Sequence, residues 1–404
     1  MHAPPVASLG PDARRAIWGL GVTQIIGYGA TYYLLSLLAR PIADEFGMST
    51  PAVLGGLSLQ LACAALFGPR IGRWQDQAGS KVVMTAGSVI VAVGLVLLGL
   101  ARGPLSYYFA WFVIGLAAPM MLYSAAFTAL TQIAGHQARR SISFLTFIGG
   151  LASTLFWPLT AWLLTLMDWR NIAFLYAAMQ IVICVPVHWR MLGRENTDGS
   201  PRAPGVIVEP GLPSAAQPAA FAFLASMLTI NGLIINAWSL LVFPVLGALG
   251  FLPSAAVLVG SLIGIAQVVG RVTESIYAGR ISAMWTGVVS AVTLPLAFMA
   301  LSLSQGITAY GVAFAVLYGI SNGLLTIARG AIVLAIFGTR GYGERINRIT
   351  IGQNIAGAIG PVLGGVLLDS TGAAELVTLM LMGSMAALLL MVALRSHCAR
   401  HGLR

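Results

Sequence analysis

Runs of about twenty apolar residues, each long enough to cross a lipid bilayer, recur along the whole chain. Twelve such runs are separated by polar connections, and they lie near residues 16–39, 52–71, 82–100, 107–130, 142–164, 172–189, 219–243, 254–274, 285–303, 308–328, 349–368 and 376–394. Only 8% of the 404 residues are charged and 58% are hydrophobic, whereas soluble domains carry about 25% charged residues. The chain is therefore expected to be an integral membrane protein.

The runs are interpreted as helices. Only helices and closed barrels satisfy all their backbone polar groups in lipid, and these runs are too long and too continuously apolar for barrel strands. The sequence predicts an all-α membrane protein with twelve transmembrane helices.

Basic residues are distributed unequally between the two sides of the predicted membrane protein. With both termini on one side, that side receives Arg14, Arg15, Arg70, Arg73, Lys81, Arg139, Arg140, Arg190, Arg194, Arg202, Arg280, Arg340, Arg345, Arg348, Arg395, Arg400 and Arg404. The other side receives only Arg40, Arg102 and Arg170. Because short loops rich in Lys and Arg stay in the cytoplasm, we expect a multi-pass protein of the cell (inner) membrane with both termini cytoplasmic.

The chain is predicted to consist of two six-helix halves, residues 1–189 and 219–404, joined by a proline-rich cytoplasmic linker over 190–218. Five pairs of identical residues lie 203 positions apart: Pro41 and Pro244, Gly47 and Gly250, Ser58 and Ser261, Gly149 and Gly352, and Pro158 and Pro361. These pairs suggest a duplication. Parallel halves of this kind are a transporter architecture with the substrate site between the halves.

The connection after the second run reads Gly72-Arg-Trp-Gln-Asp76-Gln-Ala-Gly79-Ser-Lys81. Its glycines permit a tight turn, and Asp76 can cap the third span or face the positive end of another helix. The spacing resembles the signature loop of the major facilitator superfamily, in which the loop latches the transporter's conformation. Gln77 departs from that pattern, because the family commonly has arginine there.

A narrower resemblance is to the monocarboxylate transporter branch of that superfamily. It rests on Gly360-Pro361 with the following residues up to Gly372, on the pair Arg139-Arg140, and on Trp169-Arg170. In that branch an arginine of the eighth helix binds the substrate carboxylate, and by position it corresponds to Arg271. The aromatic-glycine motif of helix one and the residues usual for proton coupling are missing, so proton co-transport is left open.

Arg271 lies inside the apolar run 254–274, where a guanidinium costs roughly 2.5–3.5 kcal/mol on insertion scales. In one interpretation it reaches the membrane interface or pairs with Glu274, three residues later. In the other it faces a water-filled cavity and holds an anion. Gln267, one turn before it, is a further substrate-binding candidate.

Four other polar residues lie in spans one, four, seven and ten, which line the central cavity in the superfamily. The resemblance therefore implies Tyr32, Tyr123, Asn231 and Asn322 as substrate-binding candidates, with interhelical hydrogen bonding as the alternative for each. The gate and conformational candidates are Gly72, Asp76, Gly79, Lys81, Glu274 and Arg329, the last also as a snorkelling residue.

Signatures of other functions are missing. No span pairs a nucleophile with a base or spaces His, Asp and Glu as metal ligands, so we expect no catalytic residue, no metal and no cofactor. The net charge of +10 is spread singly or in pairs, which argues against nucleic-acid binding. His397 and His401 are interpreted as part of a disordered basic tail.

The sequence therefore predicts a secondary transporter, not an enzyme, that moves a small organic anion, of the monocarboxylate type, by alternating access. It is expected to act as a monomer in the lipid bilayer. Efflux of another anion or of an amphipathic compound is one alternative, and a membrane sensor that does not transport is another.

Overall fold

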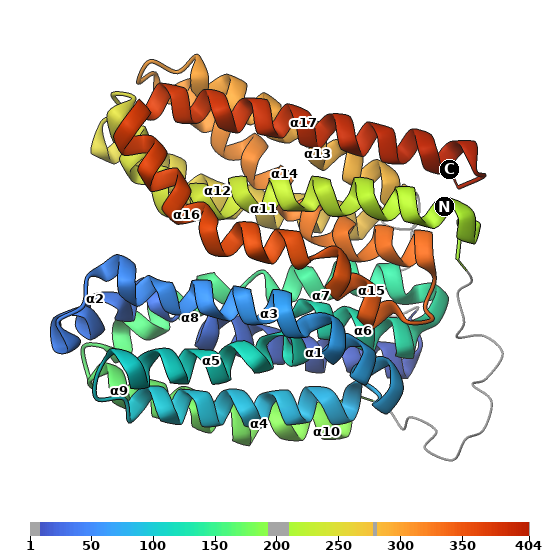
Figure 1. Cartoon of the computed structure of the whole chain (residues 1–404), viewed down its shortest axis with the longest axis horizontal. Helices are drawn as coiled ribbons and strands as arrows, with labels where there is room; N and C mark the ends of the chain where they lie inside the picture. Colours follow the sequence, from blue (N-terminus) through green and yellow to red (C-terminus); the bar gives the residue numbers. More distant parts are fainter. Residues whose placement is uncertain (1–8, 193–209, 278–280, 404) are drawn as a thin grey trace. The chain divides into compact units, whose positions relative to one another are not determined.

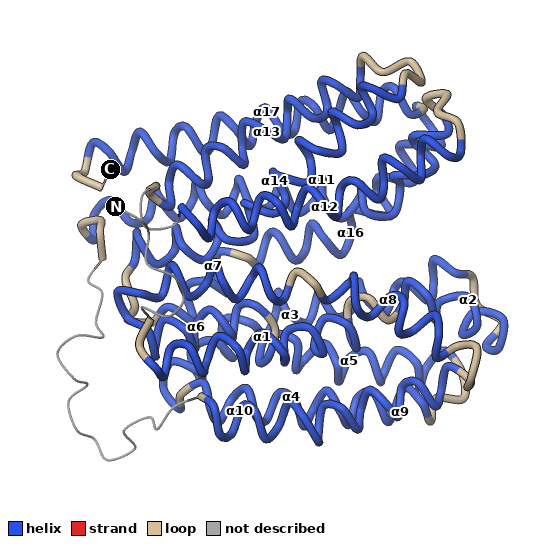
Figure 2. The backbone as a smooth tube through the Cα atoms, turned by 180° about the vertical axis from the view of Figure 1, so that it is seen from behind, coloured by secondary structure: helices blue, strands red, loops and turns tan. Residues whose placement is uncertain are grey.

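The computed structural model describes residues 9–192, 210–277 and 281–403, and every regular element in these ranges is a helix (Figures 1 and 2). Twelve helical stretches within them are long and apolar enough to cross a membrane, which confirms the predicted all-α fold. Residues 193–209 of the predicted linker lie outside the described ranges. Arg194, Arg202, Arg280 and Arg404, which entered the charge argument, also lie outside them.

The described residues form two compact units. The N-terminal unit comprises the described part of His2–Glu209 together with Thr339–Arg348, a segment from much later in the sequence. The C-terminal unit comprises Pro210–Gly338 and Ile349–Arg404.

The helices of the N-terminal unit are α1 (Pro11–Thr31), α2 (Leu35–Phe46), α3 (Thr50–Ala78), α4 (Ser80–Gly99), α5 (Pro104–Met121), α6 (Tyr123–Ala134), η2 (Gly135–Gln137), α7 (Ala138–Gly149), α8 (Ala152–Leu163), α9 (Trp169–Met179), η3 (Gln180–Cys184), α10 (Val185–Met191) and most of α15 (Tyr342–Ile349). Local signals set several of their ends. The side chains of Ser49 and Asp168 accept hydrogen bonds from the first turns of α3 and α9, and Gly47 ends α2 with a φ of 63°.

Three predicted spans of this unit are interrupted. The first breaks at residues 32–34, where the amides of Tyr32 and Tyr33 both donate to the carbonyl of Tyr28. The fourth breaks at Leu122, whose backbone is extended, and the fifth breaks at Gly150 and Leu151. Irregular backbone at membrane depth is tolerated only where protein buries it or where it lines a cavity. These breaks therefore mark places to look for a site.

The C-terminal unit contains η4 (Ser214–Ala216), α11 (Gln217–Ala248), α12 (Pro253–Tyr277), α13 (Ala283–Ser302), α14 (Thr308–Phe337), α16 (Ile351–Thr371) and α17 (Ala373–Arg400). Its core is aromatic: the ring of Trp238 on α11 lies 5.6 Å from Phe298 and 4.7 Å from Phe314, between ring centroids. Lipid offers no hydrophobic force between helices, so packing of this kind holds them together. Each such pair contributes about 0.5–1.5 kcal/mol beyond the area it buries.

The predicted disordered tail is instead helical. Helix α17 continues to Arg400, and Nε2 of His397 lies 2.9 Å from the carbonyl oxygen of Ala216, at the start of the C-terminal unit. The prediction of disorder was wrong because this contact, distant in sequence, orders the end of the helix.

Candidate functional site

Helix α12 carries Arg271, and small residues seat this helix against α14. A Cβ atom on Gly323 would lie 2.6 Å from the carbonyl oxygen of Gln267, and one on Gly319 would lie 2.6 Å from that of Ile263. Contacts this close require glycine at both positions of α14. They fix the height and rotation of α12, and with them the direction of the residues that follow Gln267.

Arg271 is 7% exposed, and no described residue accepts a hydrogen bond from its Nε atom. Glu274 is equally buried, but the two side chains form no ion pair within the part of the chain that the structure describes. The sequence left open whether Arg271 pairs with Glu274 or holds an anion. In this structure the guanidinium is buried without that pair.

The other candidates of the C-terminal unit lie on α11 and on the two packed helices. Gln267 and Asn322, both half-buried, lie on α12 and α14 where these helices come closest. Asn231 on α11 is buried, and its Nδ2 donates to the carbonyl of Met227 over 2.9 Å. Gln267 packs against Gly323, the residue after Asn322, and no hydrogen bond among the described residues joins Asn231 to Arg271.

Arg329, the second arginine of the C-terminal spans, is half-buried on α14. Its Nη1 lies 3.3 Å from Oε1 of Gln353 on α16, to which it donates a hydrogen bond. A Cβ atom on Gly232 of α11 would lie 2.7 Å from the carbonyl oxygen of Gln353. Three helices therefore meet at this arginine.

In the N-terminal unit, Tyr32 and Tyr123 belong to one aromatic cluster. The ring of Tyr28 lies 6.2 Å from that of Tyr32 and 4.8 Å from that of Tyr123, which stacks on Phe127 at 5.3 Å. The cluster surrounds the break in the fourth span, where Nε2 of Gln24 donates to the carbonyl of Met121 over 2.7 Å. The structure thus brings these two predicted residues together through Tyr28.

The predicted signature loop packs against α15. Both oxygens of Asp76 accept hydrogen bonds from the first turn of that helix, from the amides of Gly343 and Glu344 at 2.9 Å each. The sequence predicted that Asp76 either caps the third span or faces the positive end of another helix. The structure shows the second arrangement, with α15 as the other helix. Arg73 adds a two-pronged contact to the Glu344 carboxylate, at 3.0 and 2.7 Å.

The two glycines of the loop differ in what they do. Gly79 has a φ of 84° and makes the predicted turn between α3 and α4. Gly72 makes no turn: it lies inside α3, and a Cβ atom there would meet the carbonyl oxygen of Gly343 at 2.1 Å. Lys81 lies over the ring of Trp189, with 4.1 Å between Nζ and the ring centroid.

At the end of the N-terminal unit where α2 and α9 lie (Figure 1), Arg170 ties three elements together. It donates to the carbonyls of Gly99 and Ala101 at 2.8 and 2.7 Å, and it pairs with Glu45 of α2 at 2.6 Å. Nε1 of Trp169 donates to the second oxygen of Glu45. Trp169 and Arg170 therefore hold α2, the second half of the first span, in place.

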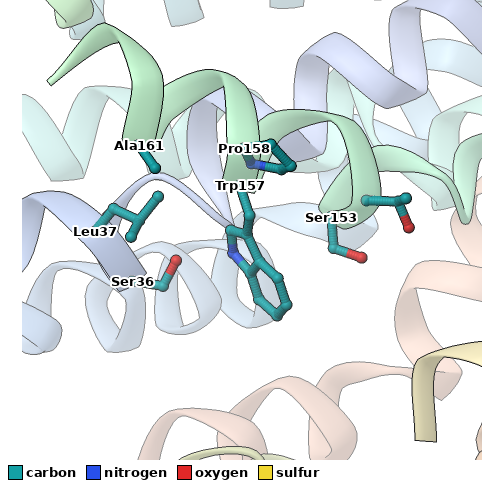
Figure 3. A pocket seen from close by; sticks show the side chains of 7 residues that line it. Ser36, Leu37, Ser153, Trp157, Pro158 and Ala161 are labelled. Carbon is teal, nitrogen blue, oxygen red and sulfur yellow. The ribbon is translucent and has the colours of Figure 1, made fainter. Parts of the chain in front are cut away.

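Sequence reasoning missed a pocket of about 460 Å³ between α2 and α8 of the N-terminal unit. It is lined by Ser36, Leu37, Ser153, Thr154, Trp157, Pro158 and Ala161 (Figure 3). The only signal in the sequence was an unusual density of aromatic and hydroxyl residues in the fifth span, which an ordinary packing interface also explains.

Comparison with known proteins relates these features to a family. The model for the Major Facilitator Superfamily matches residues 20–316. No curated protein matches the chain. Among solved structures, the human organic anion transporter MFSD10 (TETRAN) is similar over 95% of this chain and 100% of that one, with a TM-score of 0.69 and 14% identity.

The proton:xylose symporter XylE, solved with 6-bromo-6-deoxy-D-glucose, is similar over 94% of each chain, with a TM-score of 0.68 and 12% identity. At such low identity both likenesses show the fold alone. The family model, in contrast, matches well over half of the residues. The chain is thus a multi-pass secondary transporter, not an enzyme, and belongs to the major facilitator superfamily.

Proposed function

We propose that this transporter moves a small organic anion of the monocarboxylate class, and that Arg271 binds the carboxylate. The fold does not choose the substrate, because the two similar structures are described as an organic anion transporter and as a proton:xylose symporter. The proposal therefore rests on the chemistry of α12.

The observation that carries it is the buried guanidinium of Arg271, whose Nε has no acceptor among the described residues. A buried charge is expensive unless a partner neutralises it. A carboxylate can accept two parallel hydrogen bonds from one guanidinium, a geometry that a single ammonium group does not offer. A transported carboxylate would thus satisfy the side chain, and a cationic substrate would be repelled by it.

The remaining predicted residues complete the proposal. Tyr32, Tyr123, Asn231, Asn322 and Gln267 would orient the substrate through hydroxyl and amide groups. Residues 1–189 and 219–404, joined by 190–218, would rock against each other, with Gly72, Asp76, Gly79, Lys81, Glu274 and Arg329 acting on the conformational change. The transporter is proposed to act as a monomer. Whether a proton moves with the substrate is left to experiment.

Uptake of radiolabelled acetate, propionate and lactate into proteoliposomes tests whether Arg271 binds the carboxylate, which we call the anchor hypothesis. Arg271→Gln is expected to nearly abolish binding and uptake. Arg271→Lys should weaken binding by roughly 1–3 kcal/mol, because the charge stays and the paired donors are lost. Arg40→Gln is the matched control, since Arg40 is an exposed arginine on α2. Uptake with and without an imposed pH gradient identifies proton coupling.

Glu274 requires a second variant. If Arg271 served only to neutralise Glu274, the double variant Arg271→Gln/Glu274→Gln would recover transport. Under the anchor hypothesis it stays inactive while it remains folded by size-exclusion chromatography. Recovery in the double variant would falsify the assignment of Arg271, and binding without any flux would instead favour a sensor.

A further inference from the structure

Three uncharged polar side chains from three helices meet at the signature loop. They are Gln75 in the last turn of α3, Ser80 at the first position of α4 and Gln132 near the end of α6. Gln75 and Ser80 are fully buried, and Gln132 is half-buried. Because Gln75 and Ser80 flank residues 76–79, these side chains hold both ends of the segment that carries Asp76.

The three side chains form a closed ring of hydrogen bonds. Nε2 of Gln75 donates to the hydroxyl of Ser80 over 2.8 Å, and this hydroxyl donates to Oε1 of Gln132. Nε2 of Gln132 then donates to the backbone carbonyl of Gln75 over 3.2 Å, and its Oε1 also accepts the backbone N–H of Ser80 over 3.2 Å. Three of these four bonds involve Gln132, so this side chain holds the ring together.

Gln132 also satisfies the start of α4. The first amides of a helix have no acceptor within the helix, and the residue before α4 is Gly79, which has no side chain to offer. The acceptor for the amide of Ser80 comes instead from Gln132, more than 50 residues later in the sequence. The turn at Gly79 is therefore fixed by a side chain that lies outside the signature loop.

The helix that carries Gln132 is the second half of the fourth span, α6, which begins directly after the break at Leu122. It is tied to the end of α3 at two heights. Nε2 of Gln75 donates to the carbonyl of Ala125, in the first turn of α6, over 2.9 Å. Gln132 binds the same residue of α3 from about two helical turns further along. A displacement of α6 would therefore displace the end of α3.

We infer that Gln132 is a positioning residue for the contact between Asp76 and α15, so that docking of α15 depends on α6 as well as on the signature loop. Asp76 follows Gln75 directly, and its two oxygens accept amide hydrogens of α15 at 2.9 Å each. Hydrogen bonds weaken steeply when they are misaligned, so a contact of two such bonds tolerates little displacement. The inference rests on the proposed function in taking this contact to act on the conformational change.

Hydrogen–deuterium exchange of the full chain in detergent, followed in peptides covering 339–349, tests the inference. Gln132→Met keeps the length of the side chain but removes its hydrogen bonds, and it should accelerate exchange there roughly 2- to 12-fold, the net effect of one hydrogen bond. Gln132→Glu keeps the acceptor for Ser80 and should have a smaller effect. Thr131→Val is the matched control, because Thr131 is buried on the same helix and its hydroxyl donates to Thr128 of that helix; it should leave this exchange unchanged.

A double-mutant cycle separates positioning from a general loss of stability. If Gln132 acts through Asp76, Gln132→Met should add nothing to the exchange rate of Asp76→Ala, because the contact that it positions is already lost. Independent effects would multiply instead. Multiplied rates, or unchanged exchange in Gln132→Met, would overturn the inference.

The exchange measurement requires no substrate, so it decides the inference even if the proposed anions are not transported. Uptake of radiolabelled lactate by the same variants then tests the conformational role of Asp76. If the exchange effects are non-additive while both single variants transport at the normal rate, the positioning role of Gln132 stands and the proposed conformational role of Asp76 is refuted. Slower or faster uptake in both variants supports both.

Discussion

Replacing Asp76 by alanine should release the first turn of α15. Its carboxylate accepts two amide hydrogens at 2.9 Å from Gly343 and Glu344, which occupy the place of a helix cap. Loss of such a cap costs about 0.5–2 kcal/mol, and loss of the negative charge beside the helix dipole costs about 0.3–1 kcal/mol. Together they predict about 1–3 kcal/mol, or a roughly 5- to 150-fold increase in the open population of this turn.

Hydrogen–deuterium exchange measures that population directly. Peptides covering 339–349 should exchange roughly 5- to 150-fold faster in Asp76→Ala, because exchange follows the open fraction. Asp76→Asn should have an intermediate effect, since its amide keeps one acceptor and turns a donor toward the second N–H. Arg73→Gln is the control: Arg73 is exposed, so loss of its ion pair should change exchange little. Unchanged exchange in folded Asp76→Ala would refute the capping argument.

Three further predictions follow from close contacts and charge. Gly72→Ala should accelerate the same exchange as Asp76→Ala, because its Cβ would lie 2.1 Å from the carbonyl oxygen of Gly343. Gly323→Ala should lower the melting temperature and impair uptake by forcing α12 away from α14, whereas Gly264→Ala, which meets open space, should do neither. Cysteines introduced near Arg170 should be labelled from outside the cell and those in the C-terminal tail only after permeabilisation; the reverse pattern would overturn the charge argument.

The fold could be predicted because lipid imposes a simple rule. Every apolar run of spanning length must close its backbone hydrogen bonds internally, so hydropathy alone yields twelve helices. The sequence also predicted the role of Asp76 as one of two alternatives, a cap of the third span or a contact with the positive end of another helix. Sequence cannot choose between them, because the partner amides of Gly343 and Glu344 lie more than 260 residues away.

The interruptions and the pocket were beyond prediction. The break at Leu122 follows Pro119 by three residues, but prolines inside other spans, such as Pro295 in α13, interrupt nothing. Whether a proline or a glycine pair breaks a membrane helix depends on what satisfies the freed backbone groups. At Met121 that partner is Nε2 of Gln24, from another helix. The pocket was hidden because its two walls, α2 and α8, lie more than 100 residues apart in the sequence.

Residues at the 203-position offset show what the two halves share. Gly47 and Gly250 both have positive φ, 63° and 86°, at the ends of the first spans of their halves. Near equivalent positions, a cation packs on an indole in each unit: Lys81 on Trp189, and Arg395 over the ring of Trp285 at 3.8 Å. In the N-terminal unit the earlier helix carries the cation, and in the C-terminal unit the later helix carries it. The duplication stays a prediction, and these contacts are the pair that it would explain.

The two halves also differ, and these differences indicate how each half would contact a substrate. The first and fourth spans are interrupted in the N-terminal unit, whereas their counterparts α11 and α14 are continuous helices of 32 and 30 residues. A continuous helix exposes no backbone groups, so its unit must act on a substrate through side chains, and α12 supplies Arg271. In the N-terminal unit the interruptions of the first and fourth spans lie beside the aromatic cluster of Tyr28, Tyr32 and Tyr123. Charge recognition is therefore to be sought in the C-terminal unit, and recognition of shape in the N-terminal unit.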